Sequence, residues 1–149
     1  LPAGGIYSTS EDMANFCMML FNNGMYGQNR ILSERSLNEM FTVQNKYNTY
    51  DLSFKQGLIW ALYGFGGWDF AGGIAMHNGA TYTFNAQFSV LPEHKLGLIF
   101  MTNTNTGEEL LDILNHQILT KVLEFKTGIS KAKSIKIPPA EFKAEDFKK

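Results

Sequence analysis

The sequence predicts an α+β fold in which helices pack on an antiparallel sheet of three or four strands. Two observations support this prediction. Amphipathic helical patterns occur near both ends of the chain, and two adjacent strand-like segments, residues 85–91 and 96–101, lie between them. With 44% hydrophobic residues, 18% charged residues and a net charge of -1, the chain has the composition of a globular domain. At about 150 residues it is long enough for one modest core.

A capped amphipathic helix is expected over residues 10–23. Thr9 is followed three positions later by Asp12, which is the spacing of a helix N-terminus, and apolar residues then recur at helical intervals. Gly24 is expected to supply the left-handed residue that ends the helix. Ser33 is the expected N-cap of a second, shorter helix, whose apolar face is formed by Leu37, Met40 and Phe41.

The middle of the chain is expected to be irregular. Residues 43–54 are polar and rich in tyrosine, which predicts a surface loop, and residues 57–62 predict a short apolar strand in which Trp60 packs in the core. Five glycines follow around Trp68 and Phe70, and they predict a mobile hairpin loop. Nucleotide binding is not favoured there, because no Gly-Lys-Ser or Gly-Lys-Thr and no helix follows them.

The two strand-like runs differ in pattern. Residues 85–91 alternate, with apolar Ala86, Phe88 and Val90 between polar residues, as in a half-buried antiparallel strand. Residues 96–101 are apolar throughout except for Gly97. The second run is therefore expected to be the more buried strand of the hairpin.

The last helix is expected from a capping box at Thr106 and Glu109 to about Phe125. One apolar stripe is predicted to face the core, and it is formed by Leu110, Leu111, Leu114, Ile118, Val122 and Phe125. Seven of the thirteen Lys and Arg residues lie between Lys126 and Lys149. We therefore expect one domain over residues 1–125 and a basic linker or tail over residues 126–149, which allows for a further domain.

Several function classes are disfavoured. A pI of 6.3 gives no electrostatic signature of nucleic-acid binding, and no apolar run approaches the ~18 residues of a membrane span. The single cysteine, Cys17, is expected to be buried and inert. His77, His94, His116 and Cys17 are at least 17 residues apart, so no metal site and no cofactor are expected. The start at Leu1, without Met or a leader, suggests a cut piece and leaves the localisation open.

Three short motifs stand in a characteristic order. They are Pro2 to Thr9 with its Gly4-Gly5 pair, then His77-Asn78-Gly79, then a hairpin closing in Thr102-Asn103. In this order the chain resembles, over residues 1–125, the C-terminal part of the penicillin-recognising serine hydrolases. That family includes class C β-lactamases, DD-peptidases and related esterases. The resemblance implies a portion of the β-lactamase/transpeptidase-like fold that is incomplete without its N-terminal part, and an extracytoplasmic or secreted bacterial location.

The resemblance also implies roles for individual residues. In this family a Ser one helical turn before a Lys is the nucleophile, and a Lys-Thr-Gly or His-x-Gly motif lies on a sheet edge. A second motif of the family supplies a Tyr or Ser hydroxyl. Here His77 would position that hydroxyl or a substrate carboxylate, and the backbone N–H of Ala80 would be one of the two donors of the oxyanion hole. The residues implied to contact substrate are Asn78, Gly79, Thr81, Gly4 and Gly5.

Two features bear on the substrate. Tyr82, Thr83 and Asn85 make the stretch after the motif bulkier than the glycine-rich stretch of the lactamases. A neutral imidazole also holds a substrate carboxylate less well than an ammonium does, which favours peptidase-like or esterase-like relatives. A histidine satisfied by backbone groups at a strand end is the alternative for His77.

Lys126-Thr127-Gly128 and the Ser-x-x-Lys of residues 130–133 spell two motifs of the family, but in reversed order and within the basic tail. A lysine exposed to solvent keeps a pKa of about 10.4 and cannot activate a serine, so neither motif is expected to be catalytic. The chain therefore lacks a nucleophile with its base and is predicted to be inactive alone, while the parent would act by acyl transfer on a small-molecule or peptide substrate.

Two alternatives remain open. The chain is also compatible with a binding or scaffold module that recognises peptide or cell-wall fragments without turnover, and with a piece that matters mainly for assembly. A Ser-x-x-Lys and a Tyr-x-Asn encoded upstream of Leu1 would favour the enzyme. Because a truncated sheet leaves an unpaired edge and an uncovered apolar face, self-association is expected.

Overall fold

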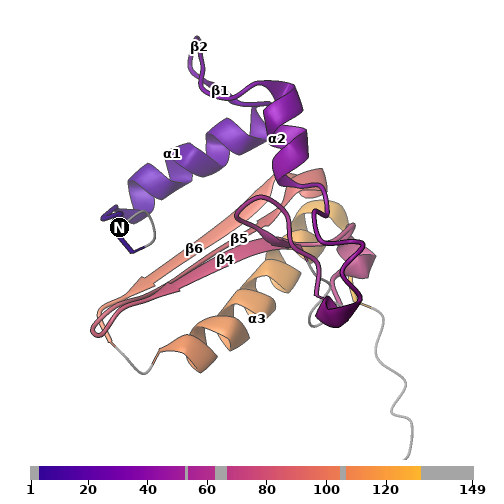
Figure 1. Cartoon of the computed structure of the whole chain (residues 1–149). Coiled ribbons are helices and arrows are strands. Elements are labelled where there is room, and N and C mark those ends of the chain that lie inside the picture. The colour runs from indigo at the N-terminus through magenta and orange to yellow at the C-terminus, as the bar shows by residue number, and fades with distance from the viewer. Residues whose placement is uncertain (1–3, 53, 63–66, 105–106, 132–149) are drawn as a thin grey trace, which may run out of the picture.

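The computed structural model describes residues 4–52, 54–62, 67–104 and 107–131. A four-stranded antiparallel sheet lies between helix α1 on one face and helix α3 on the other (Figure 1). Two hydrophobic clusters fill the spaces between the layers, one on the α1 side and one on the α3 side. The predicted α+β class is confirmed.

Helix α1 spans Ser10–Phe21, and its predicted N-cap is confirmed because the Asp12 N–H donates to Thr9 Oγ1 at 3.1 Å. The helix ends two residues earlier than expected. Asn23 (φ 53°) adopts the left-handed conformation as well as Gly24 (φ 84°), and the Gly24 N–H donates to Met19 O. A side chain at Gly24 would collide with the backbone of Leu32.

The next elements are short. Strands β1 (Met25–Tyr26) and β2 (Asn29–Arg30) form a separate two-stranded sheet that the sequence did not predict. Helix α2 spans Glu34–Met40, and Ser33 is its N-cap as predicted, since its Oγ accepts from the Ser36 N–H at 3.0 Å. The expected apolar face of α2 packs in the cluster on the α1 side.

The loop that follows α2 lies on the surface, as predicted, and contains a 3₁₀ turn, η1 (Thr49–Asp51). Strand β3 spans only Ala61–Leu62, shorter than predicted, because Ile59 has a φ of 65° and interrupts the extended chain. Trp60 is buried and stacks on Phe41, which confirms its role in the core.

The glycine-rich segment is only partly a loop. Residues 63–66 lie outside the described residues, but Trp68 is buried and is followed by a 3₁₀ turn, η2 (Asp69–Ala71). The Trp68 ring stacks on Phe70 and packs against the cluster below the sheet. This part of the segment is therefore core structure.

The main sheet has the order β3-β4-β5-β6. Strand β4 spans Ala75–Ala80, β5 spans Asn85–Leu91 and β6 spans Leu96–Thr102, with a 3₁₀ turn, η3 (Pro92–His94), between the last two. All neighbouring strands are antiparallel. The hairpin of the last two strands was predicted at almost the same bounds.

The predicted burial of that hairpin is wrong. Strand β5 is the central, buried strand, and its polar residues Asn85, Gln87 and Ser89 are buried beneath α3. Strand β6 is only half-buried, although its sequence is more apolar. The reason is tertiary: β5 has a strand on each side and helices above and below, whereas β6 is at the edge of the sheet.

Helix α3 spans Glu108–Thr127, and its N-cap is Gly107, without a side-chain hydrogen bond. Thr106 of the predicted capping box lies outside the described residues. The predicted core stripe is confirmed only in part: Leu111 is buried, but Leu110, Ile118, Val122 and Phe125 are exposed. The residues that face the sheet lie four apart on a neighbouring row, and they are Leu111, Asn115, Leu119 and Leu123.

The end of α3 holds one of the two misleading motifs. Gly128 ends the helix with a φ of 75°, and Lys126 Nζ donates to His94 O at 2.8 Å, next to the turn before β6. Lys126-Thr127-Gly128 is thus a helix C-terminus and not a strand. No helix in the described part of the chain is long and apolar enough to cross a membrane.

Candidate active-site strand

The His-x-Gly motif lies on the outer edge of the sheet. Strand β3 pairs with only the first two residues of β4, Ala75 and Met76. Residues 77–80 pair with β5 on one side, and no strand among the described residues pairs with them on the other. All four residues are exposed, so the motif stands on a free edge.

The register fixes the direction of each backbone amide in this segment. The Thr81 N–H donates to Phe84 O at 2.8 Å, which makes these two residues a hydrogen-bonded pair at the end of the β4–β5 hairpin. In an antiparallel ladder such pairs alternate with pairs whose N–H and C=O groups point away from the partner strand. Ala80 is next in the ladder, opposite Asn85, so its N–H points toward the free edge.

The same alternation gives the direction of the backbone groups in the other residues of the motif. The backbone groups of His77 and Gly79 point toward β5, and those of Asn78 point outward with those of Ala80. Met76 is in the outward set too, which agrees with its pairing to Ala61 of β3. Two outward N–H groups are therefore available side by side on this edge.

His77 is exposed and is not sealed in the interior. It lies opposite Phe88 in the ladder, so both side chains project from the same face of the sheet. Phe88 belongs to the cluster on the α1 side and contacts the ring of Phe16. The imidazole is therefore carried on the face of the sheet that α1 covers, next to the free edge.

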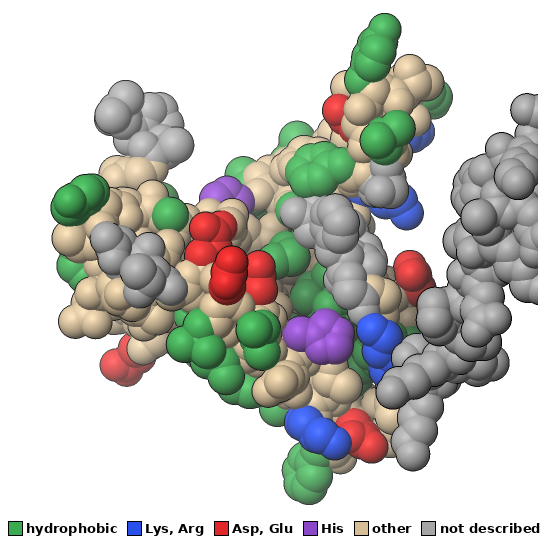
Figure 2. Space-filling model, turned by 90° about the horizontal axis from the view of Figure 1, so that it is seen from below, with side chains coloured by type: hydrophobic (Ala, Val, Ile, Leu, Met, Phe, Trp, Pro, Cys, Tyr) green, Lys and Arg blue, Asp and Glu red, His purple; other side chains and the backbone are tan. Residues whose placement is uncertain are grey.

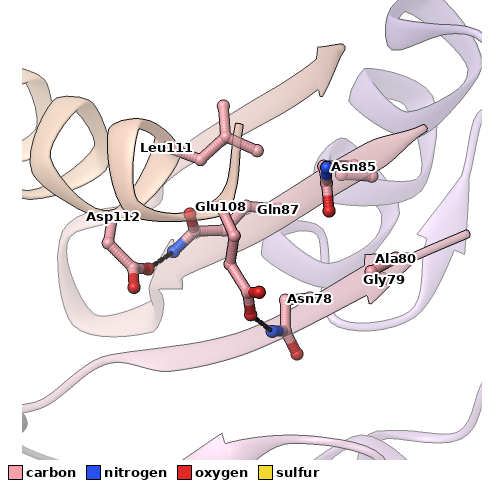
Figure 3. A pocket seen from close by; sticks show the side chains of 9 residues that line it. Asn78, Gly79, Ala80, Asn85, Gln87, Glu108, Leu111 and Asp112 are labelled. Carbon is pink, nitrogen blue, oxygen red and sulfur yellow. Dashed lines mark hydrogen bonds between the residues drawn. The ribbon is translucent and has the colours of Figure 1, made fainter. Parts of the chain in front are cut away.

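Asn78 is turned to the opposite face. Its Nδ2 donates to Oε1 of Glu108 in the first turn of α3 at 3.2 Å (Figure 3). The structure therefore does not bring the Asn78 side chain to the same face as His77. It ties the motif strand to α3.

Two further amides continue this polar contact between sheet and helix. Gln87 Nε2 donates to Asp112 Oδ1 at 3.0 Å, and Asn85 Nδ2 donates to Thr104 O at 2.7 Å. Together with Asn78 they line a small hollow of about 10 Å³ below the strand. Such a volume holds about one water molecule, so the hollow is too small for a substrate.

Both the amide and the hydroxyl of Thr81 form hydrogen bonds within the hairpin turn. Its amide donates to Phe84 O, and its Oγ1 accepts from the Phe84 N–H at 3.2 Å. Gly79 faces open space, since a Cβ placed there would meet no atom within 4 Å. A ligand can therefore approach the backbone closely at Gly79, whereas the Thr81 hydroxyl is occupied.

Gly4 and Gly5 are exposed in the segment before α1. Gly4 has a φ of 77° and open space around it. No hydrogen bond among the described residues links either glycine to β4. The structure therefore does not join them to the His77 motif.

The titratable side chains of the described residues form no further metal-binding or reactive site. No group of three or more His, Cys, Asp or Glu side chains in the described part of the chain could hold a metal ion. Burial raises the pKa of the Cys17 thiol to about 11, which keeps it protonated and unreactive near neutral pH. His94 lies in a turn, and His116 packs against the Trp68 ring.

The sequence reasoning missed the residues that support the motif from below, namely Asn85, Gln87, Glu108 and Asp112. The polar alternation of β5 was visible, but it was interpreted as a solvent-facing row. Glu108 and Asp112 at the start of α3 were not recognised as partners of the sheet. Their meeting depends on how α3 docks on the sheet, for which the sequence carries no local signal.

Comparisons with known proteins agree with this fold. The family model described as β-lactamase matches residues 2–122. Among solved structures, the crystal structure of SurE with D-Leu matches with a TM-score of 0.53 and 18% identity, covering 83% of this chain and 28% of that one. At that identity the match shows the fold alone. A search of curated proteins finds no match.

Proposed function

The chain belongs to the β-lactamase family, and we propose that it forms one wall of an acyl-transfer site in a serine hydrolase. The chain spans 28% of the solved structure that it matches, so the proposal concerns the contribution of this part. The substrates of the parent would be amides or esters, such as β-lactams, peptides of D-amino acids, or simple esters.

The observation that carries this proposal is the free N–H of Ala80. Attack on a carbonyl carbon moves an electron pair onto the carbonyl oxygen, and donors already aimed at that oxygen stabilise the charge. An outward N–H on an unpaired strand edge is such a donor, because no strand among the described residues competes for it. One such donor typically lowers the barrier by about 3 kcal/mol.

The Asn78 N–H and C=O groups extend the same function. They also point outward, so an extended acyl chain can pair with this edge as an added strand. The open space at Gly79 lets a substrate approach the backbone closely. In this proposal the strand binds the main chain of the substrate and Ala80 binds the reacting oxygen.

His77 has a positioning role in the proposal. Its exposed imidazole would donate to or accept from a hydroxyl supplied by the complementary part of the site, or contact a substrate carboxylate. A neutral imidazole binds a carboxylate less strongly than an ammonium does. This favours peptides or esters as substrates over rapid antibiotic hydrolysis.

The reaction needs a serine outside this chain. Its hydroxyl oxygen forms a bond to the carbonyl carbon and gives its proton to a base, and the collapse of the adduct then breaks the bond to the amine or alcohol, which leaves with a proton. Water hydrolyses the resulting ester in the same way. The described residues would contribute the oxyanion donor and the binding edge to both steps.

The same edge supports a second candidate function. A free strand edge with two outward N–H groups can hold an extended peptide without any chemistry. In that case the chain is a module that recognises peptide or cell-wall fragments. The two functions differ in whether a covalent adduct forms.

Acylation measured by intact-protein mass spectrometry tests the proposal. The chain alone, treated with benzylpenicillin or an activated ester, should show no covalent mass shift. A longer polypeptide encoded by the same reading frame, with Ser-x-x-Lys and Tyr-x-Asn upstream of Leu1, should be acylated. A stoichiometric adduct on the chain alone would refute the proposal, and binding without an adduct in the longer polypeptide would favour the module.

A pair of variants at Ala80 isolates the oxyanion donor. Ala80→Pro removes the outward N–H while leaving the hydrogen bonds to β5, and it should slow acylation of the longer polypeptide about 100-fold. Ala80→Gly keeps the N–H and is the control. An unchanged rate in Ala80→Pro would exclude this N–H as the donor.

A further inference from the structure

The Ala80 N–H can act as an oxyanion donor only if its direction is fixed before the reaction begins. Ala80 is the last residue of β4, and its outward side has no partner strand among the described residues. The ends of a strand open more easily than its centre, because fewer contacts hold them. Any contact that fixes this N–H therefore acts from the inner side of the strand.

Asn85 of β5 is the residue opposite Ala80. The backbone groups of these two residues point away from each other, so no backbone hydrogen bond joins them directly. Asn85 instead directs its backbone groups toward Thr102, its partner on β6. The position of Ala80 thus depends on how Asn85 is held from the other side.

The side chain of Asn85 is buried on the face of the sheet that carries α3 (Figure 3). It is only 5% exposed, and its Nδ2 donates to Thr104 O at 2.7 Å. The Thr102 hydroxyl donates to Asn85 O at 3.3 Å. Asn85 is therefore anchored both to the end of β6 and to the loop that follows it.

That loop packs closely on the start of α3. A Cβ added to Gly107, the N-cap of the helix, would lie 3.1 Å from Thr102 Oγ1 and 3.4 Å from Thr104 Cγ2. Such distances leave no room for a side chain between the loop and the helix. Through this loop, Asn85 is linked to the N-terminus of α3.

The same end of α3 holds the other outward residue of the motif. Glu108, the first residue of α3, accepts from the side chain of Asn78, two residues before Ala80. In Figure 2, which shows the α3 side of the molecule, acidic side chains gather on this face. Beyond Ala80, the Thr81 N–H is fixed by Phe84 O at 2.8 Å. Ala80 therefore lies between two held residues, and neither contact uses its outward groups.

Asparagine is an unusual residue for a buried position in a central strand. It is depleted in strands, and a buried amide without a partner costs about 1–3 kcal/mol. Asn85 was expected to make the stretch after the motif bulkier, but the structure turns its side chain to the face opposite His77. Its amide therefore contacts the fold and not a substrate.

We propose that Asn85 is a positioning residue for the oxyanion donor. Its buried amide holds the start of β5 against the loop before α3, and this fixes the direction of the Ala80 N–H across the ladder. The inference rests on the proposed function, because it assumes that this N–H binds the reacting oxygen. Asn85 itself touches neither the substrate nor the reacting atoms.

Backbone ¹⁵N relaxation of this chain measures how firmly the N–H is held. The order parameter of the Ala80 N–H should be that of a rigid backbone, about 0.85, and should fall below about 0.6 in Asn85→Ala. Asn115→Ala removes another buried amide, from the middle of α3, and should leave the order parameter unchanged. Equal order parameters in wild type and Asn85→Ala overturn the proposal. Asn85→Val, which favours a strand and also lacks the donor, replaces the alanine variant if that variant does not fold.

Acylation of the longer polypeptide tests the consequence for the reaction. Asn85→Ala should lower the acylation rate at saturating substrate about tenfold and change KM by less than about twofold, because the N–H acts mainly on the transition state. Asn115→Ala should leave both constants unchanged. A slow Ala80→Pro variant beside a normal Asn85→Ala variant would overturn this inference alone, whereas normal rates in both variants would refute the proposed function.

Discussion

Asn78 and Glu108 are thirty residues apart, and the Nδ2 of Asn78 donates a hydrogen bond of 3.2 Å to Oε1 of Glu108. This bond joins the strand that carries the His-x-Gly motif to the first turn of α3. The free edge of β4 is therefore held from the face opposite His77. It leaves the outward backbone groups of the strand accessible.

Replacing Glu108 by alanine should reduce the free energy of unfolding by less than about 1 kcal/mol, because both partners are exposed and water competes for the bond. The local effect should be larger than the global one. Hydrogen exchange at His77 and Gly79, whose amides point to β5, should become faster.

Glu109→Ala is the matched control for this substitution. It removes a charge from the same helical turn, so it has the same effect on the helix dipole. It should leave exchange in β4 unchanged. Equal rates of hydrogen exchange at the β4 amides in the two variants would show that the Asn78–Glu108 bond does not hold the strand.

Gly97 allows α1 to lie close to β6. A Cβ at this position would overlap with Sγ of Cys17, so Gly97→Ala should destabilise the fold by about 1–3 kcal/mol in urea unfolding. Cys17→Ala removes the sulfur and should recover most of that loss in the double variant. Additive losses would mean that α1 and β6 are not in contact there.

The buried thiol of Cys17 predicts a dependence on alkaline pH. Burial raises its pKa from 9.0 to about 11, so the native state holds the thiol proton more tightly than the unfolded chain does. The resulting stability is fully present below pH 9 and is lost as the pH rises to about 11. The difference in unfolding free energy between wild type and Cys17→Ala, measured across this range, should therefore shrink, and a constant difference would contradict the assignment.

Ser89 is fully buried between β5 and α3, and its Oγ has no hydrogen-bond partner among the described residues. Ser89→Ala should raise the free energy of unfolding by about 1 kcal/mol, since it removes a buried polar group that gains nothing from the fold. Ser36→Ala serves as the contrast, because the Ser36 hydroxyl is hydrogen-bonded to Ser33 and its loss should not stabilise. A clear loss of stability in Ser89→Ala would show that the hydroxyl has a partner.

Features that depend on neighbouring residues were predictable from the sequence. The caps at Thr9 and Ser33 form as predicted, because the side chain and the amide that it accepts from are three residues apart. The β5–β6 hairpin follows from alternation and a proline turn. The position of His77 on a sheet edge was implied by the family resemblance and agrees with where the structure places it.

Burial could not be predicted in the same way, because it depends on which surfaces meet. Two rows of α3 share the helical spacing, and the predicted stripe followed the row that contains Leu110. The sheet packs on the row with Asn115, and β5 with its polar residues is the central strand. The direction of the Ala80 N–H could also not be predicted from the sequence, because it depends on the register of the hairpin.

The central claim is that the Ala80 amide points to an open edge of the sheet, and residue-resolved hydrogen exchange by NMR tests it most directly. The account predicts fast exchange at Asn78 and Ala80, whose N–H groups point outward, and slow exchange at His77 and Gly79 between them in the same strand. An Ala80 amide as protected as that of Gly79 would contradict the claim.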